Sequence, residues 1–403
     1  MLTKWANACY YWVYKFTCGR NSVVECRLPK PNAVGSNPIA RFGRNCTSRS
    51  VTHYRRRIMF SRSKSITAIL LVIIWSTSAF CADSGVNLND PCAVNKLIGR
   101  GVNIGNSLES PKEGDWDVTL QEEYFQLIKD AGFNSIRLPV RWDSHAMEKA
   151  PYTLDPNFMA RIDWAIKNAL SRNLVLTINM HNYYDLFTDP NNHKERYLAI
   201  WQQIAERYKD YPNTLLFEAL NEPQDNLKGA PAWNALLKEW LAVIRKSNPN
   251  RIVVIGSANF NGFYELKSLE LPKDDRNIIV TFHYYMPYKF THQGAHWVAD
   301  ANSSLGMKWG TDQEKRTIAR DFRVAAKWGQ ENNRPIYLGE FGTYYKADPN
   351  SRFQWTKAVA DEAVKHGFSF TYWEFCHTNF GIYDPKTKTW NKELLEALIP
   401  PKQ

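Results

Sequence analysis

The sequence predicts an α/β protein that folds as a single (β/α)8 TIM barrel, and three observations lead to this prediction. Residues 83–403 contain eight short apolar segments of the kind that form buried parallel strands. Most of these segments precede a segment whose apolar residues recur at helical spacing. The region is about 320 residues long, which suits one barrel.

The first half of this region supplies four strand candidates and three helix candidates. The segment Leu97–Gly105 is apolar and contains glycines, and Leu174–Asn179 is an almost continuous apolar run, as a strand buried on both faces requires. The helix expected at Leu120–Gly132 ends on a glycine that suits a C-cap. The other candidates here are the strands Ser135–Leu138 and Thr214–Glu218 and the helices Pro156–Arg172 and His193–Tyr208.

The second half repeats the alternation. The helix expected at Pro231–Lys246 places Trp233, Leu236, Trp240 and Ile244 on one face. The remaining candidates are the strands Ile252–Ile255, Ile278–His283, Pro335–Gly339 and Ser369–Trp373 and the helices Gln313–Asn332 and Arg352–Lys365. A doubly wound open sheet is the alternative fold. It would usually have a glycine-rich phosphate-binding loop after the first strand, but Gly101–Gly105 lacks the third glycine of that motif.

The net charge of +11 lies outside the predicted barrel. Residues 1–58 hold 11 basic residues and one acid, whereas residues 83–403 hold 38 basic and 39 acidic residues. Because nucleic-acid binding needs a basic face, we expect no nucleic-acid partner for the barrel, and that alternative rests on residues 1–58 alone. We interpret residues 1–58 as a spurious or non-functional N-terminal extension, because residues 19–42 resemble a translated transfer-RNA gene.

Residues 59–82 have the pattern of a signal peptide that starts at Met59. Arg62 and Lys64 precede the apolar run Ile66–Trp75, which is too short to span a bilayer, and small residues follow up to Ala82. We therefore expect a secreted or periplasmic protein without stable membrane association, whose catalytic barrel is residues 83–403. A lipid anchor on Cys81 is the alternative.

Only Cys92 and Cys376 lie within the predicted barrel. They either form one disulfide or remain two separate buried thiols. Two cysteines cannot form a four-cysteine zinc site, and no His/Asp cluster has the spacing of metal ligands. We expect neither a metal nor a cofactor.

Reactive side chains follow six of the eight predicted strands. In a barrel the carboxyl ends of the strands meet at one face, where catalytic residues collect. Each side chain alone has an ordinary structural explanation, but six together favour an active site. They are Arg137, His181, Asn221-Glu222-Pro223, His283 with Tyr285, Glu340 and Trp373.

Two of these residues are carboxylates that follow buried apolar runs, Glu222 and Glu340. Burial raises the pKa of a carboxylate and a nearby arginine lowers it, so two such groups can divide into one acid and one ionised group. Hydrolysis of a glycosidic bond requires that division. Glu218, four residues before Glu222, is expected to be a structural carboxylate inside the barrel.

These motifs, in this order, resemble glycoside hydrolase family 5, the retaining cellulases and mannanases. The similarity covers nearly all of Asn95–Ile399, and Gly101–Glu109, Phe290–Gly294 and Tyr372–Cys376 resemble bacterial endoglucanases with glucan and mannan activity. The resemblance implies that Glu222 is the catalytic acid/base and Glu340 the nucleophile.

The same resemblance implies supporting roles for further residues. Arg137 and Tyr285 would contact Glu340, Asn221 would hold the sugar 2-hydroxyl, and His181 and His283 would position the sugar and orient the acid. The residues that would bind substrate are Asn106, Glu109, Asn182, His292, Trp297 and Trp373. Glu374 either binds a sugar hydroxyl or is structural.

Two positions depart from the close relatives. Asn182 stands where they often have a second histidine, which affects how a sugar hydroxyl is held. Phe260 stands in a loop where a tryptophan would have suggested an extra stacking platform.

The function expected is that of a secreted, retaining endo-β-1,4-glucanase that acts as a monomer on cellulose and related β-glucans. An endo-β-1,4-mannanase, or one enzyme that cleaves both glucan and mannan, is the alternative. A non-catalytic carbohydrate-binding protein is the alternative of another class, although the presence of both carboxylates argues against it.

Overall fold

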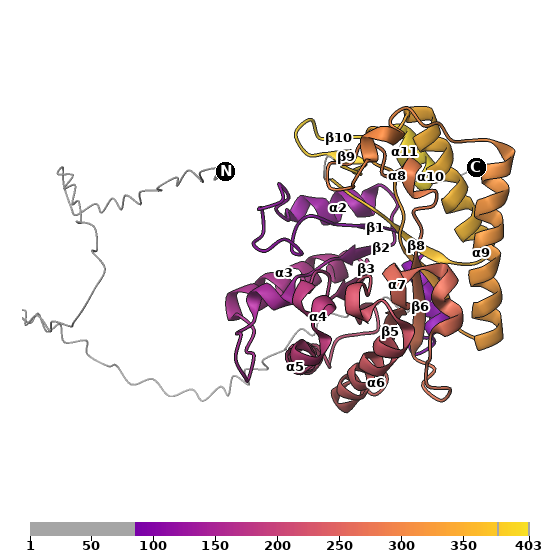
Figure 1. The fold of residues 1–403 in the computed structure, drawn as a ribbon. Helices are drawn as coiled ribbons and strands as arrows, with labels where there is room; N and C mark the ends of the chain where they lie inside the picture. The colour runs from indigo at the N-terminus through magenta and orange to yellow at the C-terminus, as the bar shows by residue number, and fades with distance from the viewer. Residues whose placement is uncertain (1–84, 377–378, 402–403) are drawn as a thin grey trace, which may run out of the picture. The chain divides into compact units, whose positions relative to one another are not determined.

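The computed structural model describes residues 85–376 and 379–401, and eight parallel strands close into a barrel in chain order (Figure 1). The predicted (β/α)8 barrel is therefore confirmed. The regions 1–58 and 59–82 lie outside the described residues. The barrel strands are β1 Arg100–Asn103, β2 Ser135–Leu138, β3 Val175–Asn179, β4 Leu215–Glu218, β5 Val253–Gly256, β6 Ile278–His283, β7 Ile336–Glu340 and β8 Ser369–Tyr372.

The barrel closes where β1 pairs with β8, with Gly101 opposite Thr371. Strands β2 to β8 are buried along their whole length, because side chains on one face fill the barrel and those on the other pack against helices. The pairing of β6 with β7 shifts between Phe282 and His283, so that His283 lies opposite Glu340. This register brings two predicted site residues side by side.

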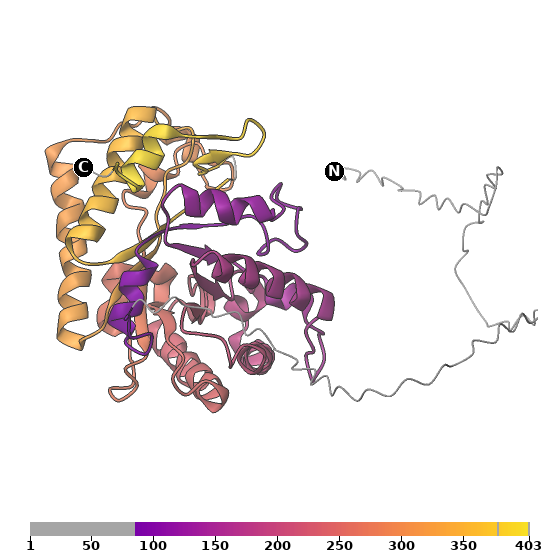
Figure 2. The same ribbon diagram turned by 180° about the vertical axis from the view of Figure 1, so that it is seen from behind.

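Helices lie around the outside of the barrel, and α9, α10 and α11 share one flank in both views (Figures 1 and 2). The long helices are α2 Glu122–Asp130, α3 Pro156–Ser171, α5 Pro190–Arg207, α6 Ala230–Ser247, α9 Asp312–Asn332 and α10 Pro349–Lys365. The short ones are α1 Pro91–Ile98, α4 Tyr184–Thr188, α7 Ala258–Asn261, α8 Tyr288–Thr291 and α11 Lys392–Leu398. The 3-10 helices are η1 Trp142–His145, η2 Asp225–Leu227, η3 Phe263–Ser268 and η4 Ala301–Ser304.

Local sequence signals explain where the longer helices begin. Asp155 accepts hydrogen bonds from the backbone of α3 at Asn157, and Pro156 fits the first helical turn. Thr311 and Glu314 form a capping box at the start of α9. These caps satisfy backbone N–H groups that have no partner inside the helix.

The prediction of one strand over Leu97–Gly105 was wrong at its start. Leu97 and Ile98 belong to α1, whose N-cap is Asp90, and Gly99 ends that helix with a φ of 52°. The capping aspartate and Pro91 favour a helix, and apolar residues alone do not distinguish a short helix from a strand. The other predicted elements are present with shifted ends, whereas α4, α7, α8, α11 and the hairpin of β9 Tyr383–Asp384 and β10 Thr389–Trp390 were not predicted.

The core has two layers along the barrel axis. Apolar residues of α1 pack with inward-facing residues of the strands and close the N-terminal end; this cluster comprises Val94, Ile98, Val175, Leu216, Ile252, Val254, Ile279 and Tyr337. Nearer the C-terminal end, Arg137 and Glu218 are fully buried. Polar residues can occupy that layer because they bind one another.

Cys92 is exposed and Cys376 is buried, and both are free thiols. The disulfide alternative was therefore wrong, and so was the expectation that both thiols would be buried. Burial raises the pKa of Cys376, so this thiol stays protonated. In the part of the chain that the structure describes, no helix is long and apolar enough to cross a membrane.

Candidate active site

The two carboxylates singled out in the sequence lie together at the C-terminal end of the barrel. Glu340 ends β7, and Glu222 lies four residues beyond the end of β4 with a left-handed φ of 43°. A carboxylate oxygen from each residue and a ring nitrogen of His283 all lie within 4.8 Å of one another. Strands far apart in the sequence thus bring two acids and a histidine to one point.

Arg137 on β2 joins the buried polar groups beneath this pair. Its Nε and Nη2 each donate to Glu218 at 2.7 Å, and its Nη1 donates to Glu340 Oε1 at 2.5 Å. It also donates to the side-chain oxygens of Asn103 and Asn221, at 2.9 and 2.8 Å. Glu218 therefore has the structural position expected of it, as partner of a buried arginine. One guanidinium fixes the carboxylate of Glu340 and the amide of Asn221 together.

Two further side chains contact the carboxylates near the mouth of the barrel. The Tyr285 hydroxyl donates to Glu340 Oε2 at 3.0 Å, so both oxygens of Glu340 accept hydrogen bonds. His283 Nδ1 lies 2.8 Å from Glu222 Oε1 and 3.8 Å from Glu340 Oε2. The contacts of Arg137 and Tyr285 with Glu340 are those that the sequence led us to expect.

These environments give Glu222 and Glu340 different tendencies to hold a proton. Burial raises the pKa of Glu222 to about 7, although the charge of Arg137 opposes the rise. Burial also raises the pKa of Glu340, although the charge of Arg137 and its hydrogen bond to Glu340 oppose the rise. Because Glu340 accepts from Arg137 and Tyr285 while Glu222 contacts only His283 among the described groups, a single proton on the pair resides on Glu222.

The two histidines of the site are neutral. Burial lowers the pKa of His283 to about 4, with the carboxylate of Glu340 opposing the fall. Burial also lowers the pKa of His181, and the positive charge of Arg137 adds to that effect. His181 Nδ1 lies 3.1 Å from the Asn179 amide, and its ring stacks on Trp373 at a centroid distance of 5.6 Å. The stacked pair forms one wall of the site.

A second pair of buried acids lies behind Trp373. Asn106 donates through its side chain to Glu374 at 2.6 Å and through its backbone to Glu109, which also accepts from Ser107 N at 2.9 Å. Burial raises the pKa of Glu109 to about 8. Burial also raises the pKa of Glu374 well above its ordinary value, and the charge of Glu109 adds to that rise. Asn106, Glu109 and Glu374 form one cluster, which the sequence did not indicate because β1 and β8 supply separate parts.

The remaining predicted substrate-binding residues are less closely joined to the acids. Asn182 donates to the Glu109 carbonyl at 3.2 Å. His292 stacks on Tyr288 at 4.0 Å and touches the ring of Tyr285 at 5.1 Å. Trp297 is 47% exposed and contacts Tyr344 edge-on, so it lies outside the buried centre.

Sequence reasoning missed two residues that contact this centre. Asn103, within β1, accepts from Arg137 and donates to the carbonyls of Gly339, Thr371 and Tyr372, at 3.0–3.2 Å. Asn261 places its amide nitrogen 3.4 Å from His283 Nε2. A buried asparagine inside an apolar strand was the available signal for Asn103. The asparagine-rich turn before Gly262 was the signal for Asn261.

Among the described residues, Glu222, His283 and Glu340 are also the one group of three side chains whose atoms are close enough to ligate a metal. Arg137 already donates to Glu340, and a guanidinium beside a ligand disfavours a second cation. The arrangement therefore fits acid–base chemistry, and the expectation of no metal stays a prediction.

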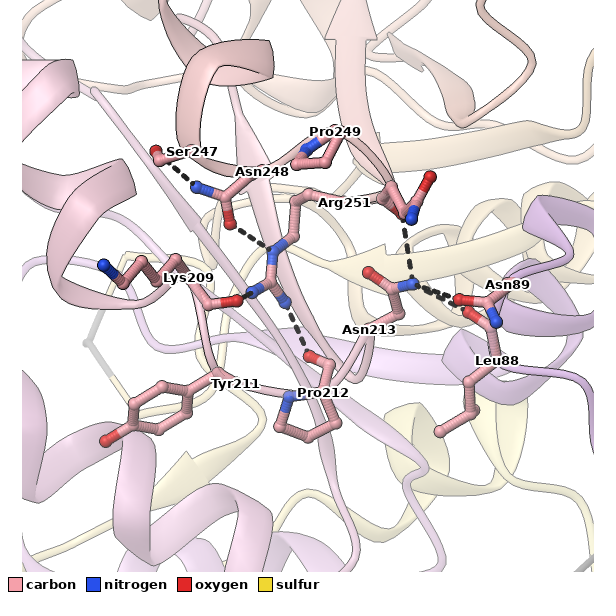
Figure 3. A pocket seen from close by; sticks show the side chains of 11 residues that line it. Leu88, Asn89, Lys209, Tyr211, Pro212, Asn213, Ser247, Asn248, Pro249 and Arg251 are labelled. Carbon is pink, nitrogen blue, oxygen red and sulfur yellow. Dashed lines mark hydrogen bonds between the residues drawn. The ribbon is translucent and has the colours of Figure 1, made fainter.

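A separate surface depression of about 330 Å³ lies at the other end of the barrel (Figure 3). It is lined by Leu88, Asn89 and the segments that precede β4 and β5, including Arg251. Arg251 donates to backbone carbonyls of Tyr208, Pro212 and Leu215 and to the side chain of Asn248. The donors of Arg251 bind other groups of the protein, so this depression has the features of a structural contact between loops.

Comparison with known proteins identifies the family. Residues 99–379 match the family Cellulase (glycosyl hydrolase family 5). Endoglucanase H of Acetivibrio thermocellus is 38% identical over 317 residues, which are 77% of this chain and 34% of that protein. Endoglucanase B of Clostridium cellulovorans is 27% identical over 328 residues, 74% of this chain and 73% of that protein.

Solved structures agree with this result. The structure of Thermotoga maritima Cel5A in complex with mannotriose is 50% identical, with a TM-score of 0.76, and the match covers 77% of this chain and 100% of that chain. The same protein in complex with cellobiose gives the same values. The chain spans about a third of the length of Endoglucanase H and 39% of Cellulase/esterase CelE, also from Acetivibrio thermocellus. With its closed barrel and its match over residues 99–379, the chain belongs to glycosyl hydrolase family 5, the cellulase family.

Proposed function

We propose that the protein is an endo-β-1,4-glucanase that hydrolyses internal bonds of cellulose and related β-glucans with retention of anomeric configuration. One observation carries the retaining mechanism: oxygens of Glu222 and Glu340 lie within 4.8 Å of each other. Retaining glycosidases hold their two carboxyl groups about 5–5.5 Å apart, whereas inverting enzymes need about 6.5–9.5 Å to admit a water. The matching relatives named endoglucanases support the substrate class.

In the first step, Glu340 attacks the anomeric carbon while Glu222 gives its proton to the departing glycosidic oxygen. The carbon–oxygen bond to the leaving sugar breaks, and an ester between the sugar and Glu340 forms. Arg137 and Tyr285 hold Glu340 ionised and oriented before the attack. The pKa of Glu222, raised to about 7, keeps it protonated below neutral pH.

In the second step, Glu222 acts as a base. It removes a proton from a water molecule, whose oxygen attacks the anomeric carbon and releases Glu340 as a carboxylate. Asn221, fixed through its side-chain oxygen by Arg137, is the group proposed to hold the sugar 2-hydroxyl. Trp373, backed by His181, offers an apolar face on which a pyranose ring can stack.

A second candidate function is cleavage of β-1,4-mannan in addition to glucan. Cel5A of Thermotoga maritima, which is 50% identical, has been solved with both cellobiose and mannotriose. Glucose and mannose differ only in the orientation of the 2-hydroxyl, so one cleft can admit both. The amide of Asn182, which donates to the Glu109 carbonyl, is the group proposed to influence this choice.

The test is reducing-sugar release from carboxymethylcellulose, mixed-linkage β-glucan, glucomannan and galactomannan. Glu340→Ala is the control, and NMR of the first-formed product reads its anomeric configuration. Release from the glucans, lost in the control, with a β product is expected. Comparable release from galactomannan would make the enzyme dual-specific. An α product would disprove retention, and sugar binding without release would indicate a binding protein.

We also propose that the protein is secreted as a monomer after cleavage of the leader at residues 59–82. The apolar run Ile66–Trp75 followed by small residues supports this proposal. N-terminal sequencing of the protein from culture medium is expected to begin near residue 83, and light scattering is expected to give the mass of one chain. An N-terminus before Met59 would contradict the interpretation of residues 1–58.

A further inference from the structure

Asn261 reaches the proposed acid/base through one histidine. The side chain of Asn261 is fully buried, and its Nδ2 lies 3.4 Å from His283 Nε2. The opposite ring nitrogen, Nδ1, lies 2.8 Å from Glu222 Oε1. His283 therefore bridges Asn261 and Glu222, with one ring nitrogen on each.

A neutral imidazole carries one proton, so one nitrogen donates and the other accepts. His283 is neutral, because burial lowers its pKa to about 4. An amide nitrogen only donates, so Nε2 facing Asn261 Nδ2 must be the acceptor. The ring proton then lies on Nδ1, where it is donated to Glu222. Asn261 thus determines which way the histidine donates.

A left-handed turn holds Asn261 in this place. Asn259, Phe260 and Asn261 have φ values of 53°, 62° and 53°, a conformation that asparagine tolerates better than most residues. Gly256 leaves room for the Asn261 side chain, because a Cβ there would lie 2.2 Å from its Oδ1. The backbone of Gly262 pairs with that of His283.

The same turn also contacts the chain beside Glu222. Phe260 N donates to the Pro223 carbonyl at 3.1 Å, directly after Glu222. The turn is thus tied both to the residue after the acid/base and to the histidine that contacts the acid/base. A turn built on strained residues that binds both neighbours of a reactive group is arranged for positioning.

We propose that Asn261 is a positioning residue of the hydrolysis reaction, which donates to His283 Nε2 and so keeps the ring proton on Nδ1 for donation to Glu222. This inference rests on the proposed acid/base role of Glu222. A hydrogen bond donated to the carboxylate stabilises its ionised form. Asn261 therefore favours the state in which Glu222 acts as a base.

Several charged or titratable groups lie near His283 and also influence the pH dependence of activity. They are Arg137 on β2, His181 after β3, Glu218 on β4, Glu222 after β4, and Glu340 on β7. A variant that leaves all of them in place isolates the contribution of Asn261. Asn261→Gly does so, because glycine accepts the left-handed backbone.

Nitrogen NMR of protein labelled with 15N-histidine tests the tautomer directly. At pH 8.5, above the pKa values of His283 and Glu222, wild type is expected to show His283 protonated on Nδ1 and bare on Nε2. The resonances are assigned by their loss in His283→Gln. Asn261→Gly is expected to shift the ring toward a mixture of both tautomers. Wild-type protonation on Nε2, as an amide oxygen facing the ring would give, would overturn the inference.

The pH dependence of kcat/KM gives the second readout. Loss of the donated hydrogen bond is expected to move the basic limb upward by about half a pH unit in Asn261→Gly. Asn259→Gly, a neighbour with the same left-handed φ of 53°, is the matched control and should leave the limb unmoved. Equal effects in both variants would mean that the turn acts only as structure. The tautomer result does not depend on activity, so it separates failure of this inference from failure of the acid/base role, which Glu222→Gln tests.

Discussion

Two arginines are buried at opposite ends of the barrel, and they differ in what they bind. Arg137 at the C-terminal end binds the carboxylates of Glu218 and Glu340, whereas Arg251 at the N-terminal end binds carbonyl and amide oxygens (Figure 3). Burial disfavours the charge of both. The two carboxylates nevertheless raise the pKa of Arg137, while burial lowers the pKa of Arg251 to about 10.

The difference separates function from stability within one fold. Carboxylates can gain or lose a proton, so Arg137 influences which acid of the active site is ionised. Carbonyls cannot, so Arg251 only joins the loops that precede β4 and β5. In barrels of this type chemistry lies at the C-terminal end, and residues at the N-terminal end contribute to stability.

The largest expected effect follows from breaking the C-terminal network. Arg137→Met leaves Glu218 and Glu340 buried without a cation, which raises the pKa of Glu340 and protonates the nucleophile. We expect kcat/KM to fall by about 10³-fold or more. Arg137→Lys, which keeps the charge, should retain the fold and recover part of the activity. Circular dichroism checks folding, and full activity in either variant would contradict the role of Arg137.

The matched change at the N-terminal end should act on stability instead. Arg251→Met removes the side-chain donor that three backbone carbonyls share, and two of these hydrogen bonds are buried. The free energy of unfolding should fall by about 3 kcal/mol. At temperatures where the variant stays folded, kcat should match that of wild type. Urea unfolding and initial rates measure the two effects. If Arg251→Met lowered kcat without lowering the free energy of unfolding, the assignment of Arg251 to stability would be wrong.

The active site is also expected to be the more pH-sensitive end. Glu222 must be protonated to donate to the leaving group, and its pKa is raised to about 7. Thus kcat/KM should fall about tenfold per pH unit above pH 7. A substrate with a highly acidic leaving group departs without receiving a proton. If formation of the glycosyl-enzyme is measured with such a substrate, the decline above pH 7 should become shallower. A flat profile to pH 9 with an ordinary substrate would contradict the assignment.

The same raised pKa affects stability. The folded state binds the Glu222 proton more tightly than the unfolded chain, whose pKa is about 4.5, so ionisation destabilises the fold. The contribution of this group is fully present below pH 4.5 and is lost as pH rises toward 7. Glu222→Gln should therefore show a smaller decline in Tm across that window than wild type. An unchanged decline would assign the slope to the other buried acids, Glu109 and Glu374.

The smallest effect is expected for a single hydrogen-bonded joint at the N-terminal end. Asn213 donates to the Leu88 carbonyl at 2.9 Å (Figure 3). Its side-chain oxygen accepts from Ile252 N at 3.1 Å. Asn213→Ala should lower the free energy of unfolding by about 1 kcal/mol and leave activity unchanged. Thermal unfolding measures the loss. A change in kcat would show that the two ends of the barrel are coupled.

The sequence alone determined the fold class, seven of the eight strands to within a few residues, and the positions of Glu222 and Glu340 at or just beyond the ends of strands β4 and β7. It could do so because buried parallel strands read as apolar runs, and catalytic side chains follow those runs at their carboxyl ends. It failed at Leu97 and Ile98, because an apolar run beside a capping aspartate suits a helix as well as a strand.

The family resemblance implied the contacts of Arg137 and Tyr285 with Glu340, but only the tertiary structure decided which other polar groups meet. Asn103, Arg137, Glu218 and Glu340 come from four strands, and the closure of the barrel makes them one network. The contact of Asn261 with His283 and the burial of Glu374 beside Glu109 have the same origin. Periodicity in a sequence reports burial along one element, whereas pKa values and hydrogen bonds depend on groups that other elements bring close.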